Sequence, residues 1–78
     1  MTIKELIKKR DYDYISLRAL LPIKLGGGEI FYGVCKSENG KLIPLDDDTY
    51  DENTEVIDWE EWVGDEKEHS LTILFKME

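Results

Sequence analysis

The residues of this chain that could do chemistry are carboxylates, and most of them fall in one segment. Residues 46–68 hold twelve of the eighteen Asp and Glu residues and a single basic residue, Lys67. The segment carries a formal charge of −11 and the whole chain −8, so the rest of the chain sums to +3. Carboxylates at this density could bind divalent cations, transfer protons in catalysis, or present a negative surface to a basic partner.

A calcium loop is the first chemistry to test, because Asp46, Asp47 and Asp48 are followed closely by Asp51 and Glu52. An EF-hand loop needs oxygen ligands at positions 1, 3 and 5, glycine at position 6 and glutamate at position 12. Counting from Asp46 puts aspartate at position 6 and isoleucine at position 12, and counting from Asp47 puts glutamate and aspartate there. We therefore expect no cofactor and no dedicated metal site, although weak binding of Ca²⁺ or Mg²⁺ stays open.

Nucleophilic catalysis would require the only cysteine, Cys35, or a serine to lie beside the only histidine, His69. Cys35 falls in an apolar stretch, where a free cysteine usually packs as a small hydrophobic residue. His69 falls in a segment whose composition predicts a polar loop. No pair of carboxylates is singled out for acid–base work. We therefore expect a protein that is not an enzyme.

Recognition of a basic surface on another protein is the chemistry that these carboxylates fit best. On an extended strand, residues two apart share a face about 6.5–7 Å apart, so Asp58 and Glu60 would present carboxylates at the pitch of successive phosphates. With the acidic residues of the preceding loop beside them, the surface of Asp46–Glu68 could imitate nucleic-acid phosphates and inhibit a nucleic-acid-binding protein. The candidate protein-binding residues are Asp46, Asp47, Asp48, Asp51, Glu52, Asp58, Glu60 and Trp62.

Two other interpretations stay open. The acidic residues could serve only to keep a small domain soluble. The chain could also be an accessory interaction or homodimerisation module that binds through a strand edge and its aromatic residues. Trp59 and Trp62 cannot share a face of one regular strand, so we expect Trp59 in the core and Trp62 at its rim. Alternatively, Trp62 anchors an interface together with Tyr50.

Charge and hydropathy limit the partners and the cell compartment that we expect for the protein. The basic residues are scattered except at residues 8–10, so we expect no direct binding to nucleic acid. The longest apolar stretch, residues 19–23, is too short to span a bilayer, so we expect no membrane partner. We expect no signal peptide, because the N-terminal residues are charged and amphipathic, and the single cysteine cannot form an intramolecular disulfide; both points favour the cytoplasm.

The elements that must position these residues can be read from periodicity. Thr2 and Glu5 form a capping box ahead of an apolar face at helical spacing, which predicts a helix over residues 3–10. Residues 11–13 are expected to form a break between this helix and the first strand. Alternation of apolar and polar residues then predicts strands over 14–20, 30–36, 41–45, 55–63 and 71–77. The residues expected to face inward are Ile15, Leu17 and Ala19 in the first of these strands and Leu71, Ile73, Phe75 and Met77 in the last. Asn39-Gly40 predicts a tight hairpin turn, and Pro44 places its strand at a sheet edge.

These elements indicate an α+β fold in a single domain, residues 1–78. One short N-terminal helix is followed by about five strands, which we expect to be mostly antiparallel because their connections are short. A curved sheet packed on the helix and a small open barrel both agree with this pattern. Glu61 interrupts the apolar face of residues 55–63, so the strand is expected to end or bulge there.

The runs Leu42–Tyr50 and Val56–Trp62, with the terminal Leu71–Leu74, resemble short uncharacterised proteins of phages and integrated mobile elements in Gram-positive gut bacteria. The resemblance covers most of the chain and carries no functional residues across. It implies a small accessory protein, a class in which some members inhibit host defence.

Overall fold

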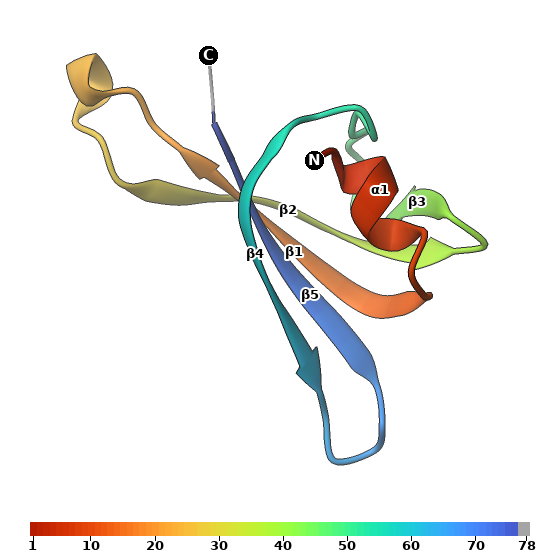
Figure 1. The fold of residues 1–78 in the computed structure, drawn as a ribbon. Helices are drawn as coiled ribbons and strands as arrows, with labels where there is room; N and C mark the ends of the chain where they lie inside the picture. Colours follow the sequence, from red (N-terminus) through yellow and green to blue (C-terminus); the bar gives the residue numbers. More distant parts are fainter. Residues whose placement is uncertain (77–78) are drawn as a thin grey trace.

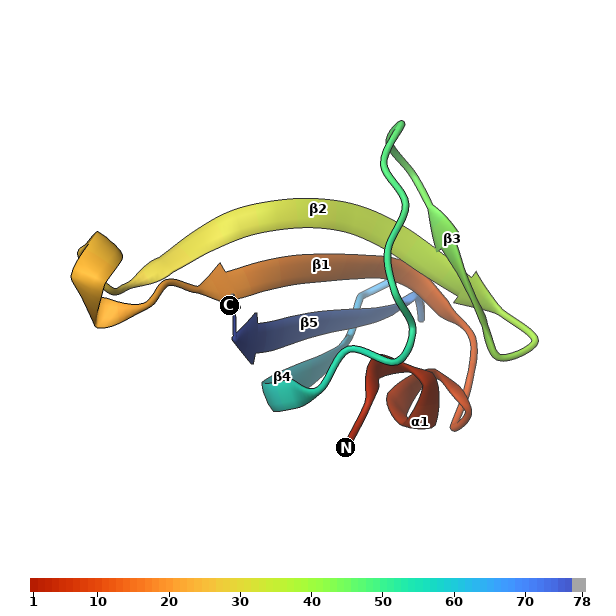
Figure 2. The ribbon, with the colours of Figure 1, turned by 90° about the horizontal axis from the view of Figure 1, so that it is seen from above.

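The fold, seen in a computed structural model that describes residues 1–76, is one mixed five-stranded sheet with a single helix on its concave side (Figures 1 and 2). The strand order is β3-β2-β1-β5-β4. The first and last strands, β1 and β5, pair in parallel, and the other three pairings are antiparallel. The elements are α1 (Ile3–Ile7), β1 (Tyr12–Leu20), the 3₁₀ turn η1 (Ile23–Leu25), β2 (Glu29–Glu38), β3 (Lys41–Pro44), β4 (Val56–Val63) and β5 (His69–Lys76).

This architecture confirms the predicted α+β fold with a curved sheet, and the sheet does not close into a barrel. Its two edges are β3 and β4, which lie at opposite ends of the strand order. The chain therefore has to cross the whole sheet between residues 45 and 55, and Figure 2 shows this crossing segment.

Helix α1 begins where the sequence predicts and ends earlier. The Thr2 hydroxyl accepts from the Glu5 N–H, and the Glu5 carboxylate accepts from the Thr2 N–H, which completes the capping box. The helix ends at Ile7 and not at residue 10, and the Lys9 N–H bonds to the Leu6 carbonyl in a tighter turn. This early end lets the chain turn into β1.

The core lies between α1 and the concave face of the three central strands. The apolar residues predicted to face inward on β1 and β5 are buried, and Met77 lies outside the described residues. Tyr12 corrects the predicted break, because β1 begins at this residue and its side chain is 1% exposed. Its N–H donates to the buried Ser37 hydroxyl at 3.0 Å. The core residues are Ile3, Leu6, Ile7, Tyr12, Ile15, Leu17, Ala19, Cys35, Leu71, Ile73 and Phe75.

The hairpin between β2 and β3 forms at the predicted place. Asn39 and Gly40 have φ angles of 53° and 76°, as a type I′ turn requires. β3 is a short edge strand that ends at Pro44, in agreement with the prediction from the missing proline N–H. At the other end of β2, the β1–β2 arm projects from the body and carries η1 at its tip (Figure 1).

Candidate protein-binding site

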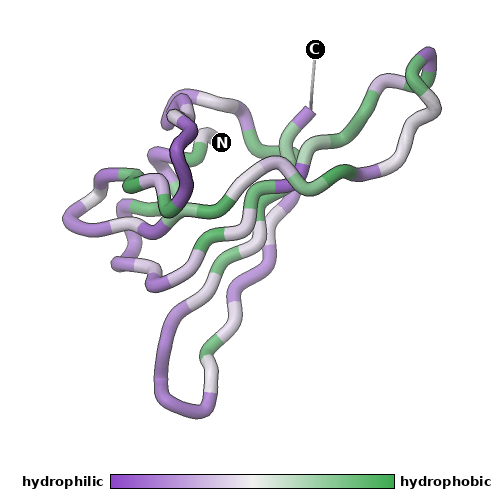
Figure 3. The backbone as a smooth tube through the Cα atoms, turned by 180° about the vertical axis from the view of Figure 1, so that it is seen from behind, coloured by the Kyte–Doolittle hydropathy of each residue, from purple (hydrophilic) through white to green (hydrophobic). Residues whose placement is uncertain are grey.

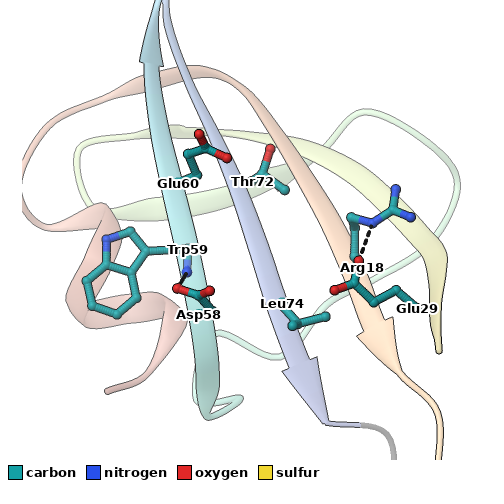
Figure 4. A pocket seen from close by; sticks show the side chains of 7 residues that line it. All are labelled: Arg18, Glu29, Asp58, Trp59, Glu60, Thr72 and Leu74. Atoms are coloured by element: carbon teal, nitrogen blue, oxygen red, sulfur yellow. Dashed lines mark hydrogen bonds and ion pairs between the residues drawn. The ribbon is translucent and has the colours of Figure 1, made fainter. Parts of the chain in front are cut away.

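β4 is an edge strand, and a bulge decides which of its side chains face which way. Val56 pairs with Phe75 and Asp58 with Leu74, so Ile57 is the extra residue of the bulge. Beyond the bulge, Asp58, Glu60 and Trp62 lie on the uncovered convex face of the sheet, opposite Leu74, Thr72 and Ser70. Figure 4 shows Asp58 and Glu60 on this face. The strand therefore places both predicted carboxylates on one face, as the alternation predicts.

Trp59 lies on the helix side of β4, but the expectation that it is a core residue is wrong. Its side chain is 38% exposed, because β4 is the outermost strand and α1 covers the central strands. The Lys9 ammonium stands 5.9 Å from its ring centroid, within the range of a cation–π contact. Trp62, on the convex face, is 58% exposed. An anchoring role for Trp62 stays a prediction.

Glu61 does not end β4, contrary to the expectation from its charge. The Tyr12 hydroxyl donates to its carboxylate at 2.5 Å, so the interruption of the apolar face is matched by a buried donor from β1. Burial of Tyr12, followed by this hydrogen bond, raises the pKa of the phenol to about 12. The Glu61 carboxylate is therefore engaged within the fold and is a poor candidate for contacting a partner.

The acidic residues at the start of the crossing segment are held against β2. Asp46 accepts hydrogen bonds from the Tyr50 hydroxyl at 2.6 Å, the Asp48 N–H at 3.1 Å and the Val34 N–H at 3.4 Å. The hydrogen bond from Tyr50 is the main reason why the pKa of Asp46 is lowered. Tyr50 in turn packs against Tyr32, with ring centroids 5.9 Å apart. Asp46 thus fixes the crossing segment to the sheet.

The end of the crossing segment is also tied by its own carboxylates. Asp51 accepts from the Asn53 N–H at 2.9 Å, and Glu52 accepts from the Leu42 N–H on β3 at 2.7 Å. The Glu52 carbonyl accepts from the Lys4 N–H of α1. Only Asp47 and Asp48, among the predicted site residues of this segment, accept no hydrogen bond at their carboxylates within residues 1–76.

The predicted site therefore separates into two parts. Asp46, Asp47 and Asp48 follow β3 at one edge of the sheet, and Asp51 and Glu52 lie by α1 and β3. Asp58, Glu60 and Trp62 lie on β4 at the opposite edge. The expected single phosphate-like track is not formed, because the chain crosses the sheet between the two groups.

The structure adds residues of the following turn to the β4 group. We define the acidic hairpin as residues 56–68, which hold six acidic residues and Lys67, a net charge of −5. Its tip projects from the body and is strongly hydrophilic (Figure 3). The ion pairs within residues 1–76 involve Glu29, Glu38 and Glu55, so none neutralises this hairpin. Three tip residues, Asp65, Glu66 and Glu68, lie within the predicted acidic surface of Asp46–Glu68 but are not among the candidate protein-binding residues, although their place in a turn next to Asp58 and Glu60 is a usable signal.

A shallow hollow of about 320 Å³ opens on the convex face beside the acidic hairpin (Figure 4). Asp58 and Glu60 form one side, Leu74 and Thr72 the floor, and Arg18 with Glu29 the other side. Arg18 pairs with Glu29 at 3.4 Å and does not pair with the β4 carboxylates. The hollow offers two carboxylates next to the apolar side chain of Leu74, which suits the head and stem of a basic side chain.

The groups that metal binding or nucleophilic catalysis would need are not brought together in the described chain. No three His, Cys, Asp or Glu residues among residues 1–76 are grouped so as to hold a metal ion. Cys35 is fully buried in β2, and burial raises the pKa of its thiol to about 12. His69 is the first residue of β5 and not part of a loop, and its N–H donates to Asp13. β1 separates the strands of Cys35 and His69.

None of the helices in residues 1–76 is long and apolar enough to cross a membrane. No protein-family model, no curated protein and no solved structure matches the chain. The resemblance to proteins of phages and mobile elements therefore stays a prediction, and the geometry of the acidic hairpin is what bears on function.

Proposed function

We propose that this protein is a non-enzymatic domain that binds the basic surface of another protein through its acidic hairpin. The observation that carries the proposal is the position of Asp58 and Glu60 on an open edge strand, in a hairpin of net charge −5 that has no ion pair within residues 1–76. Such a surface attracts a Lys- and Arg-rich partner and orients it during association. The single, buried cysteine supports a cytosolic setting.

The proposed effect of binding is inhibition by imitation of nucleic-acid phosphates. Asp58 and Glu60 lie two residues apart on one face of β4, and Asp65, Glu66 and Glu68 continue the charge into the turn. A nucleic-acid-binding protein presents Lys and Arg side chains at phosphate spacing, so the acidic hairpin would occupy the same groove. The resemblance noted above would place such an inhibitor among accessory proteins of phages or mobile elements.

The test is a pull-down from a Gram-positive host lysate with matched variants. Asp58→Asn/Glu60→Gln removes two charges from β4, and the control Asp47→Asn/Asp48→Asn removes two from the opposite edge of the sheet. We expect the first pair to weaken capture about tenfold and the control to change it about twofold or less, as local charge complementarity requires. Capture should fall between roughly 50 mM and 500 mM salt, and added duplex DNA or RNA should displace the partner. Equal losses for both pairs, or no displacement, would sink the proposal.

A second candidate function is an accessory interaction or homodimerisation module in which the carboxylates only aid solubility. The exposure of Trp62 and Val63, 58% and 64%, at the same strand edge favours it. A partner that stays bound at high salt and to Asp58→Asn/Glu60→Gln would select this second candidate.

A further inference from the structure

The backbone of β4 has a free edge whose hydrogen-bonding positions can be assigned. The Trp59 N–H donates to the side chain of its neighbour Asp58 at 2.9 Å, so it points away from β5. The Gly64 N–H donates to the Glu68 carbonyl at 2.9 Å, so position 64 is paired across the hairpin. Antiparallel strands alternate between paired and outward positions. The N–H and C=O groups of Trp59, Glu61 and Val63 therefore face outward.

The chain's own N-terminus already pairs with the start of this edge. The Val56 N–H donates to the Met1 carbonyl at 2.7 Å, and the Ile3 N–H donates to the Thr54 carbonyl at 3.1 Å. Thr2 and Glu55 form an antiparallel bridge between these bonds. An extended segment thus adds to the edge in the antiparallel sense up to the bulge at Ile57, and the outward groups from Trp59 to Val63 are left for another strand.

A second copy of this chain is a poor occupant of the free edge. In a two-fold antiparallel pairing, outward positions meet outward positions, so the axis must pass at Glu61 if the whole free stretch from Trp59 to Val63 is to be paired. This register sets Glu61 directly opposite Glu61 of the other copy. Like charges directly opposite one another destabilise a strand pair. The same charges favour a strand that carries basic residues.

We infer that the free edge of β4 accepts an extended segment of the partner as a sixth, antiparallel strand. Its basic residues would lie opposite Glu60 and Asp58 on the convex face, and an apolar residue opposite Trp62. Read from its N-terminus, the segment has the pattern apolar–x–basic–x–basic. Backbone hydrogen bonds supply affinity, and the alternate side chains supply specificity. The inference rests on the proposed function, because it names the shape of the basic surface that the acidic hairpin binds.

The probe is the synthetic peptide Thr-Val-Thr-Lys-Thr-Lys-Thr, which sets valine against Trp62 and the lysines against Glu60 and Asp58. Its control, Thr-Val-Thr-Lys-Lys-Thr-Thr, has the same composition, but its adjacent lysines must point to opposite faces of a strand, so the second lies opposite Trp59 and not Asp58. Binding is followed by the backbone amide shifts of the ¹⁵N-labelled full chain, with any tag at the C-terminus because Met1 lies against the edge under test. We expect the control to bind about fivefold more weakly, since one charged pair is lost.

Two N-methylated peptides separate strand pairing from attraction between charges. The N–H of the third peptide residue would face Glu61 of β4, whereas the N–H of the fourth would face solvent. Methylation of the third nitrogen should weaken binding about fivefold or more, because a ladder hydrogen bond is lost. Methylation of the fourth nitrogen should leave binding within about twofold. Hydrogen exchange at the Glu61 and Val63 amides should slow with the first-named, unmethylated peptide.

Three outcomes would overturn the inference. Equal binding of the control and both methylated peptides would leave the acidic recognition of the proposed function intact but remove the added strand. No amide shifts in β4 with any peptide would show that the edge is not the docking position, and the pull-down would still test the proposed function separately. Changes in the chemical shifts of the β4 amides with protein concentration alone would show that a second copy of the chain, and not a basic segment, occupies the edge.

Discussion

Substitution of Gly33 by alanine should destabilise the fold, although strand propensity alone predicts the opposite. Gly33 lies buried in β2 with no positive φ angle, so alanine meets no backbone strain there. A Cβ atom built on Gly33 collides with the Tyr50 hydroxyl and lies 2.5 Å and 2.8 Å from the Cζ and Cε1 atoms of its ring. Tyr50 would have to move away, and with it the hydrogen bond that holds Asp46.

The sign of the effect follows from two opposing magnitudes. Alanine in a strand interior is favoured over glycine by about 0.5–1 kcal/mol. Overpacking of a fixed contact costs about 1–3 kcal/mol, and the collision is with a ring whose hydroxyl is tied to Asp46. The net loss is therefore about 0–2.5 kcal/mol, centred on about 1 kcal/mol, which lowers the Tm of a domain of this size by up to about 20 °C. Removal of the ring by Tyr50→Ala should reverse the sign, so that Gly33→Ala then stabilises by about 0.5–1 kcal/mol.

The assay is a double-mutant cycle on chemical unfolding, followed by the fluorescence of Trp59 and Trp62 and by circular dichroism. Coincident transitions by the two probes establish two-state unfolding, which the comparison of free energies requires. A stabilising Gly33→Ala in the wild-type background would refute the reasoning. An equal loss in the wild-type and Tyr50→Ala backgrounds would also refute it, because the contact with Tyr50 could not then be the cause.

Three further predictions concern the core and the helix. Tyr12→Phe keeps the buried ring but loses the hydrogen bond to Glu61, so denaturant unfolding at pH 8 should show a loss of about 1 kcal/mol. Because the folded-state pKa of Tyr12 is about 12 against an ordinary value of 10, the unfolded chain ionises first. The contribution of the Tyr12 phenol to the free energy of unfolding is therefore fully present below pH 10 and is lost from pH 10 to 12. This pH-dependent loss of stability should be absent in Tyr12→Phe. The buried Cys35 thiol should resist iodoacetamide at pH 8 until denaturant unfolds the chain, and mass spectrometry would detect any modification of the native protein. Thr2→Ala should cost about 1 kcal/mol by removing the helix cap, whereas Thr2→Ser should cost little, as thermal unfolding of the two variants would show.

Features that depend on neighbouring residues were predictable from the sequence. The capping box of Thr2 and Glu5 and the turn at Asn39-Gly40 are confirmed, because both are set by a few consecutive residues. The inward faces of β1 and β5 are confirmed as well, since each strand has one buried face and a simple alternation. The burial of Tyr12 was not predicted, because this residue stands between two aspartates in the sequence and is buried only by the packing of α1 on the sheet.

Features that depend on strand order were not predictable. The alternation in residues 55–63 does not say that β4 is an edge strand, and this position leaves Trp59 exposed. The bulge at Ile57 lies upstream of Glu61, the residue where the charge suggested an interruption. Glu61 is tolerated because a hydroxyl from a strand two places away reaches its carboxylate.

The sequence by itself determined how much charge the protein has and that Asp58 and Glu60 share one face of a strand, because strand alternation is a local property. Tertiary structure decided which carboxylates share a surface. The strand order puts β3 and β4 at opposite edges, so Asp46–Glu52 in the crossing segment lie apart from the acidic hairpin. Several of their carboxylates accept hydrogen bonds that hold the chain in place. Pairing between distant segments, which no run of neighbouring residues encodes, thus divided one acidic sequence into a structural part and a candidate binding part.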